Sequence, residues 1–161
     1  MKHPIFIACF VLLLCVQCMV KTPAISGYYE YNTECIGTSR DGFQVVKTWG
    51  TGLNHNQAVF NARKNAVDDI IFKGIRDGKG GCQVSPLVSN PNLKRDHQAY
   101  FNDFYASNGA FQDFVTDPTG RWIDRALKEN PLSDGNTAYE VLVEVDVRGL
   151  RAFLINQNFI Q

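Results

Sequence analysis

The sequence predicts a single α+β domain in which a four-stranded antiparallel sheet carries its helices on one face. Two observations lead to this fold class. An amphipathic helical pattern follows a strand in the N-terminal half, and a strand of alternating valines near the C-terminus runs directly into a second short helix. Because each pattern has an apolar face that must be buried, the helices are expected to cover the sheet. The expected order is β-β-α, a helical insertion, then β-β-α.

The first helix is predicted over about residues 57–73. A strand is expected to end in the Gly-Thr-Gly turn at residues 50–52, with Asn54 as the helix N-cap. Three alanines at four-residue spacing would allow the helix axis to approach the sheet closely. At 100° per residue the apolar side chains form one continuous face. These are Val59, Phe60, Ala62, Ala66, Val67, Ile70 and Ile71, with Ala58 beside them.

Arg63 interrupts this apolar face near its middle. An unpaired guanidinium cannot be buried cheaply, so two interpretations are open. The aliphatic stem could cover apolar surface while the charge meets a structural carboxylate. Alternatively, Arg63 could be a cation that faces a ligand or a partner.

The strands are predicted from alternation. Residues 28–36 and 43–49 would form a hairpin around a turn at 37–42, and residues 139–147 form the clearest strand, with valine at every second position from 141. Residues 120–127 are expected to be a strand and 128–136 a turn. A C-terminal helix over 148–156 would bury Leu150, Phe153 and Leu154, and Phe159 and Ile160 would complete the core.

The segment at about residues 90–116 is predicted to be a helical insertion. Asn90 can cap a helix that has Pro91 at its first position, and a second short helical stretch is expected at 110–115. The segment is dense in aromatic residues: Tyr100, Phe101, Phe104, Tyr105, Phe111 and Phe114. Either these side chains pack against the domain, or they form a partly exposed patch for a partner.

Residues 1–20 have the pattern of a signal peptide, with Lys2 before an apolar core too short to span a bilayer. Residues 21–26 are expected to be a tether and 27–161 the folded domain. Cys18 and Cys15 are candidate lipidation sites, although both could be ordinary residues of the leader. Export to the periplasm, free or anchored to the outer membrane, is expected, with membrane contact only through such a lipid.

Two cysteines, Cys35 and Cys82, remain after the leader. In an oxidising compartment they could form a disulfide, which would contribute about 4 kcal/mol by restricting the unfolded chain. Two buried thiols or a reactive cysteine are the alternatives.

The composition and motifs indicate no catalytic or cofactor chemistry. The net charge is zero, which gives no electrostatic case for nucleic acid. His55 and His97 are isolated, without neighbours at metal-ligand spacing. Asp68 and Asp69 would point about 100° apart on the helix and are expected to form a solvated face. The Gly-Thr-Gly sequence lacks the Lys-Ser/Thr pair of a phosphate-binding loop. No metal, no cofactor and no enzymatic activity are therefore expected.

The strand, the Gly-x-Gly turn and the helix with Ala58, Ala62, Arg63 and Ala66, followed late in the chain by the strand that ends in Val145-Asp146-Val147, resemble small envelope lipoproteins of Gram-negative bacteria. These include flagellar-assembly and outer-membrane lipoproteins with a strand-helix-strand-strand core. The resemblance covers two blocks and leaves residues 90–116 outside. It implies an envelope-located structural or adaptor protein and carries no catalytic residues.

The expected function is therefore a non-enzymatic cell-envelope protein that binds another envelope protein or a cell-wall component. The alternative is a periplasmic module that binds a small ligand. In that case the candidate binding residues are Arg63, Tyr100, Phe101, Phe104 and Tyr105. An enzyme whose site assembles from distant residues is a third, less favoured hypothesis.

Overall fold

A computed structural model describes residues 32–79, 82–118, 129–132 and 135–161 of the chain. The expected signal peptide, the tether, Cys15 and Cys18 lie outside the described residues, as does the strand expected at 120–127. Within the described residues, no helix is both long and apolar enough to cross a membrane.

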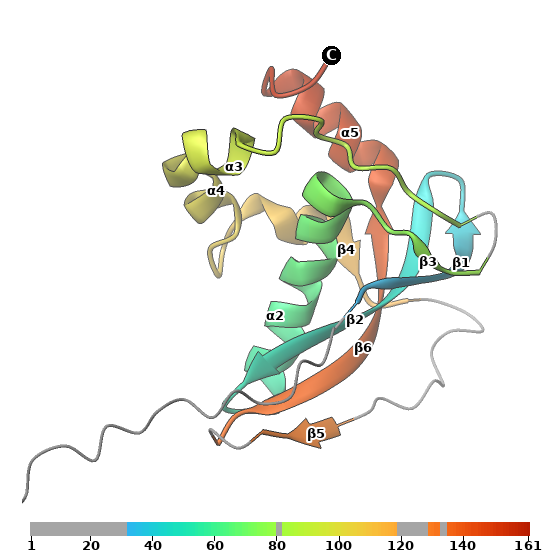
Figure 1. The fold of residues 1–161 in the computed structure, drawn as a ribbon, viewed down its shortest axis with the longest axis vertical. Coiled ribbons are helices and arrows are strands. Elements are labelled where there is room, and N and C mark those ends of the chain that lie inside the picture. Colours follow the sequence, from blue (N-terminus) through green and yellow to red (C-terminus); the bar gives the residue numbers. More distant parts are fainter. Residues whose placement is uncertain (1–31, 80–81, 119–128, 133–134) are drawn as a thin grey trace, which may run out of the picture.

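The domain is α+β, as predicted, but its sheet is mixed rather than four-stranded and antiparallel (Figure 1). Its order is β3-β1-β2-β6-β4, and β5 also pairs with β6. The difference arises because β3 is added in parallel to β1, and because β4 and β5 each pair with part of β6. The strands are β1 (Glu34–Arg40), β2 (Phe43–Gly52), β3 (Asp77–Gly78), β4 (Val115–Thr116), β5 (Glu129–Pro131) and β6 (Thr137–Asp146).

The centre of the sheet is the antiparallel pair β2–β6, which joins the two halves of the chain over ten residue pairs from Phe43↔Asp146 to Gly52↔Thr137. Val46 lies opposite Val143, and both belong to the main core. The predicted valine strand and its pairing with the N-terminal hairpin are thus confirmed. β1 continues through most of the expected turn at 37–42, because two irregularities in its pairing with β2 let it remain hydrogen-bonded as far as Arg40.

Helix α2 (His55–Asp68) crosses one face of this pair, as Figure 1 shows in green, and continues as a π-helical turn, η2 (Asp69–Lys73). The Asn54 side chain accepts a hydrogen bond from Gln57 N at 3.0 Å, so the predicted N-cap is confirmed. Ala58, Ala62 and Ala66 are fully buried. The alanine face therefore packs on the sheet as predicted.

The Gly-Thr-Gly sequence is not a turn, which corrects the expectation for residues 50–52. These residues belong to β2 and pair with β6. Glycine is required here by close approach: a Cβ on Gly50 would lie 2.1 Å from Ala58 O and 2.2 Å from Ala62 N. The small residues of the helix and the glycines of the strand together bring α2 into contact with the sheet.

The insertion contains α3 (Leu93–Asp96), α4 (Gln98–Phe104) and the 3₁₀ helix η3 (Ala110–Phe114), which leads into β4. Its aromatic residues fill the space between α2 and the C-terminal helix. Phe60 meets Phe111 with ring centroids 5.4 Å apart, and Phe104 meets Phe153 at 5.6 Å. The interpretation that these aromatics pack against the domain is confirmed for the buried Phe101, Phe104, Tyr105 and Phe111; Tyr100 is half-buried.

Helix α5 (Val147–Asn156) follows β6 directly, and Asp146 caps it by accepting from Gly149 N at 2.8 Å. Leu150 and Leu154 are fully buried in the same core as the α2 residues. Phe159 and Ile160 pack against this core, as expected.

Cys35 and Cys82 form a disulfide with a Cα–Cα distance of 5.7 Å. It links β1 to the segment that follows β3, so the disulfide expected from the sequence is present, and both side chains are buried.

Candidate functional site

A pocket of about 550 Å³ opens between α2 and the first part of the insertion. We call it the cationic pocket, because it brings together three positively charged side chains from segments thirty residues apart. Lys64 comes from α2, Lys94 and Arg95 come from α3, and the polar amides come from α4. It is lined by Lys64, Pro91, Lys94, Arg95, Gln98, Phe101, Asn102 and Tyr105.

The floor of the cationic pocket is the edge of the aromatic core. Phe101 is 2% exposed and Tyr105 is 6% exposed. Phe101 also contacts Phe72 of η2, with ring centroids 5.2 Å apart. Because the floor belongs to a close-packed core, it is held in place before any ligand arrives.

Two of the cations are positioned by the Tyr105 ring. The Lys64 Nζ atom lies 5.9 Å from the ring centroid and the Lys94 Nζ atom 5.3 Å from it. An ammonium within about 6 Å of an aromatic face is attracted by the negative face of the ring. The two long side chains therefore share one aromatic anchor at the pocket.

The three cations differ in how far they are already neutralised. Lys94 pairs with the Asp68 carboxylate at 2.5 Å, and Arg95 contacts its neighbour Asp96 at 3.3 Å. For Lys64, no carboxylate partner exists among the residues that the structure describes. Positive charge is therefore in excess over negative charge at the pocket.

The Tyr105 hydroxyl is buried near the Asp68 carboxylate, but it forms no hydrogen bond of full geometry with any described residue. Burial is the main cause that raises the pKa of this phenol, and the negative charge of nearby Asp68 raises it further. Tyr105 therefore stays neutral through the physiological range, and its ring remains a neutral platform for the two lysines.

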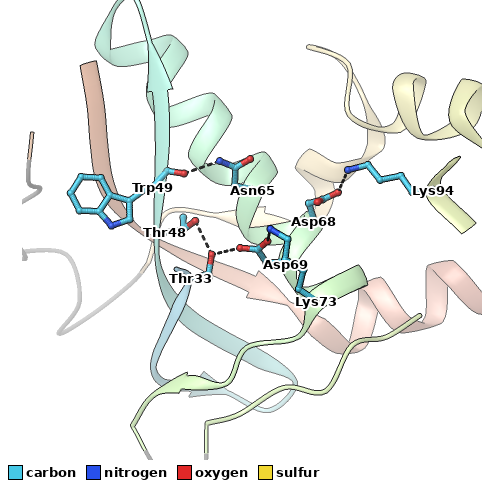
Figure 2. A network of polar contacts seen from close by, with 8 residues as sticks. All are labelled: Thr33, Thr48, Trp49, Asn65, Asp68, Asp69, Lys73 and Lys94. Atoms are coloured by element: carbon cyan, nitrogen blue, oxygen red, sulfur yellow. Dashed lines mark hydrogen bonds and ion pairs between the residues drawn. The ribbon is translucent and has the colours of Figure 1, made fainter. Parts of the chain in front are cut away.

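A second polar group is centred on Asp69 and lies on the side of Asp68 away from Lys94 (Figure 2). Asp69 is only 8% exposed. Its carboxylate accepts from the Thr33 hydroxyl at 2.5 Å and pairs with Lys73 Nζ at 2.7 Å, while Thr33 contacts Thr48 at 3.1 Å between hydroxyl oxygens. The hydrogen bond to Asp69 is the main cause that raises the pKa of Lys73.

The solvated face expected for the two aspartates is therefore wrong for Asp69. The reason is the π-helical turn, in which Gly74 N donates to Asp69 O at 2.7 Å across five residues. The wider turn directs Asp69, Ile70 and Ile71 into buried positions in succession. Since both oxygens of Asp69 have partners, we assign this group a structural role: it ties η2 to β2 and to the residue before β1.

Arg63 does not enter the cationic pocket. It forms an ion pair with Asp117, at the end of β4, and its side chain is 31% exposed. Arg63 thus meets a carboxylate, as the first of the two interpretations expects. The cation that α2 contributes to the pocket is the next residue, Lys64, which points about 100° further around the helix.

Of the other candidate binding residues, Phe101 and Tyr105 line the cationic pocket. Tyr100 and Phe104 instead line a separate hollow with Asp103 and Gly109. The sequence analysis missed Lys64, Lys94 and Arg95. The adjacent Lys94-Arg95 pair at the start of a helix was the available signal, but it acquires meaning only when the insertion folds against α2.

The two histidines make ordinary aromatic contacts, His55 with Tyr139 at 4.8 Å and His97 with Phe159 at 5.1 Å between ring centroids. Within the described ranges, no cluster of three or more potential metal ligands occurs. Comparison of the chain with protein-family models, curated proteins and solved structures found no match.

Proposed function

We propose that the chain is an exported, non-enzymatic cell-envelope protein that binds another envelope component through the cationic pocket and the surface around it. The observation that carries this proposal is the pocket itself, in which Lys64, Lys94 and Arg95 converge above a buried aromatic floor. Concave sites with a few converging polar groups and an apolar base are the usual form of a binding site.

The charge of the pocket supports a binding role because it contrasts with the rest of the molecule. The whole chain has a net charge of zero, whereas the three charged side chains that line the pocket are all positive. Like charges repel one another, so bringing them together costs free energy unless negative charge offsets them. Asp68 and Asp96 offset two of the three, and a bound anionic partner would offset the third.

The architecture supports recognition by a preformed surface. The insertion that provides most of the pocket is packed on α2 and α5 through fully buried rings such as Phe111. A preformed site loses little conformational entropy on binding. The insertion is thus a preformed platform whose buried aromatic side chains belong to the main core.

The location in the envelope rests on the leader-like residues 1–20, on the resemblance to envelope lipoproteins and on the Cys35–Cys82 disulfide. A single disulfide that closes a long loop is typical of proteins that fold in an oxidising compartment.

The alternative function is a small-ligand-binding module. It is favoured by the size of the cationic pocket, about 550 Å³, which falls within the roughly 300–1,000 Å³ range of small-molecule sites. In that case Lys64 would take the role that the sequence suggested for Arg63.

The test is site-specific photo-crosslinking in the organism that makes the protein. A photoreactive residue would replace Asn102, which is exposed at the pocket, and the matched control would carry it at Arg151 on the exposed face of α5. We expect a light-dependent adduct of defined mass from position 102 that is missing from position 151. A macromolecular adduct supports the adaptor, and an adduct of small-molecule mass supports the alternative.

An absence of adducts at position 102, or the same set of adducts at both positions, would contradict the proposal that this pocket is the binding surface. Intact mass of the purified mature protein would separately report its cleavage site and any acyl chain at Cys15 or Cys18.

A further inference from the structure

We infer that the cationic pocket binds a phosphomonoester carried on a small apolar or planar body. This inference deepens the proposed function by naming the chemical class that the site recognises, and it rests on that proposal for its biological role.

The charge available to a ligand comes from Lys64 and Arg95. Lys64 is half-buried and lies over the Tyr105 ring, with no carboxylate partner among the described residues, and Arg95 forms a surface ion pair with the adjacent Asp96. Lys94, in contrast, is held by Asp68 and contributes less net charge. Lys64 therefore offers an unpaired charge, and Arg95 a charge that Asp96 offsets in part through two long contacts of 3.3 and 3.4 Å. This positive excess suits a phosphomonoester, which carries about −1.5 to −2 near neutral pH.

The arrangement of donors favours phosphate over a single carboxylate. Lysine acts as a point charge that binds phosphate without a fixed fork, while arginine offers paired N–H donors. Gln98 and Asn102 of α4 add amide donors to the lining of the pocket. A phosphate presents three terminal oxygens and can accept from several of these groups together, whereas a carboxylate presents two.

The shape requires more than phosphate alone. The pocket volume of about 550 Å³ is many times the share of one water molecule in the liquid, about 30 Å³. Its remaining walls are Pro91 and the edges of Phe101 and Tyr105. An apolar or planar body next to the phosphate would cover these walls, and its burial would add affinity that inorganic phosphate lacks.

The experiment uses the purified mature protein and phenyl phosphate as the probe, with binding followed by heteronuclear NMR titration. Inorganic phosphate tests the contribution of the ring, and benzoate tests the contribution of the second negative charge. We expect saturable shifts at the backbone amides of Lys64, Arg95 and Asn102. We expect phenyl phosphate to bind on the order of tenfold more tightly than either control compound.

Two variants and one control assign the charges. Lys64→Gln and Arg95→Gln should each weaken phenyl phosphate binding by about threefold to tenfold, since each removes a charged hydrogen-bond donor at a solvent-accessible site. Arg151→Gln removes the same charge from α5, outside the pocket, and should leave binding unchanged. The thermal midpoint of each variant establishes that it is folded.

A lipid such as phosphatidic acid and a soluble phosphate ester both carry a phosphomonoester group, and a vesicle-binding experiment distinguishes the two sources. Flotation with phosphatidylcholine vesicles that contain phosphatidic acid, compared with phosphatidylcholine alone, should show Lys64-dependent binding if the phosphate belongs to a lipid. If the protein binds phenyl phosphate but ignores both vesicles, the source is soluble. Either result supports the inference.

Three outcomes would overturn it: shifts that do not saturate, equal weakening by Arg151→Gln, or equal affinity for phenyl phosphate and inorganic phosphate. These results are distinguishable from failure of the proposed function. A pocket-specific crosslink at position 102 together with no binding of phenyl phosphate would retain the adaptor and reject the phosphate.

Discussion

Gly50→Ala tests the closest approach in the fold, between β2 and α2. A Cβ at this position would lie 2.1 Å from Ala58 O, whereas ordinary contact begins at 3.4 Å, so the helix would have to move away by about 1.3 Å. A gap of about 0.5–1 Å between two packed surfaces already removes a quarter to a half of the dispersion energy of each contact. We therefore expect a loss of about 3 kcal/mol in the free energy of unfolding, at the upper end of overpacking.

The measurement is urea unfolding followed by circular dichroism, with Thr51→Ala as the matched control. Thr51 is the exposed neighbour on the same strand, so its truncation should change the free energy of unfolding by less than about 0.5 kcal/mol. The clash involves backbone atoms of Ala58 and Ala62, so the added substitution Ala62→Gly should not restore stability. A Gly50→Ala protein as stable as the control, or full rescue by Ala62→Gly, would refute the reasoning.

Three further predictions concern the site and the core. Tyr105→Phe should cost little at neutral pH, because the hydroxyl forms no hydrogen bond of full geometry and lies near the negative charge of Asp68. Above pH 10, the ordinary pKa of tyrosine, the wild type should lose about 1.4 kcal/mol of stability per pH unit relative to this variant, since only the unfolded state releases the proton. Parallel pH-dependent unfolding checks this, and identical alkaline slopes would contradict it. The double change Cys35→Ala with Cys82→Ala should lower the free energy of unfolding by about 4 kcal/mol. Chemical denaturation would measure this loss, and an unchanged midpoint would show that the disulfide does not stabilise the fold. Asp69→Asn should destabilise by about 2 kcal/mol through Thr33 and Lys73, while Asp96→Asn on the surface should have little effect; comparable losses from both would argue against a buried anchor.

Local periodicity was sufficient to predict the elements that carry the fold. The alanine face of α2, its Asn54 cap and the alternating valines of β6 each depend on residues within one element. Their burial follows because each apolar face must be removed from water wherever it packs. For Cys35 and Cys82 the sequence left a disulfide, two buried thiols and a reactive cysteine open, and the structure shows the disulfide.

Features that depend on contact between distant segments could not be predicted in this way. The short strands β3 and β4 have two residues each, too few for a periodic signal. Gly50 was expected in a turn because glycine commonly marks turns, but its role is to admit a helix backbone. The partial π character of the helix end, which buries Asp69, also leaves no simple pattern in the residues.

The cationic pocket shows most directly which features the sequence predicted and which depended on the tertiary structure. By itself, the sequence determined that residues 90–116 form an aromatic-rich helical insertion and that α2 carries one cation, Arg63, among its apolar residues. Only the tertiary structure decided that Lys64, rather than Arg63, faces Lys94 and Arg95, while Arg63 is taken by Asp117. The physical reason is that the spacing of apolar residues predicts which side of a helix is buried. Whether a cation on that helix lines a pocket depends on which segment packs beside it, and that segment is distant in the sequence.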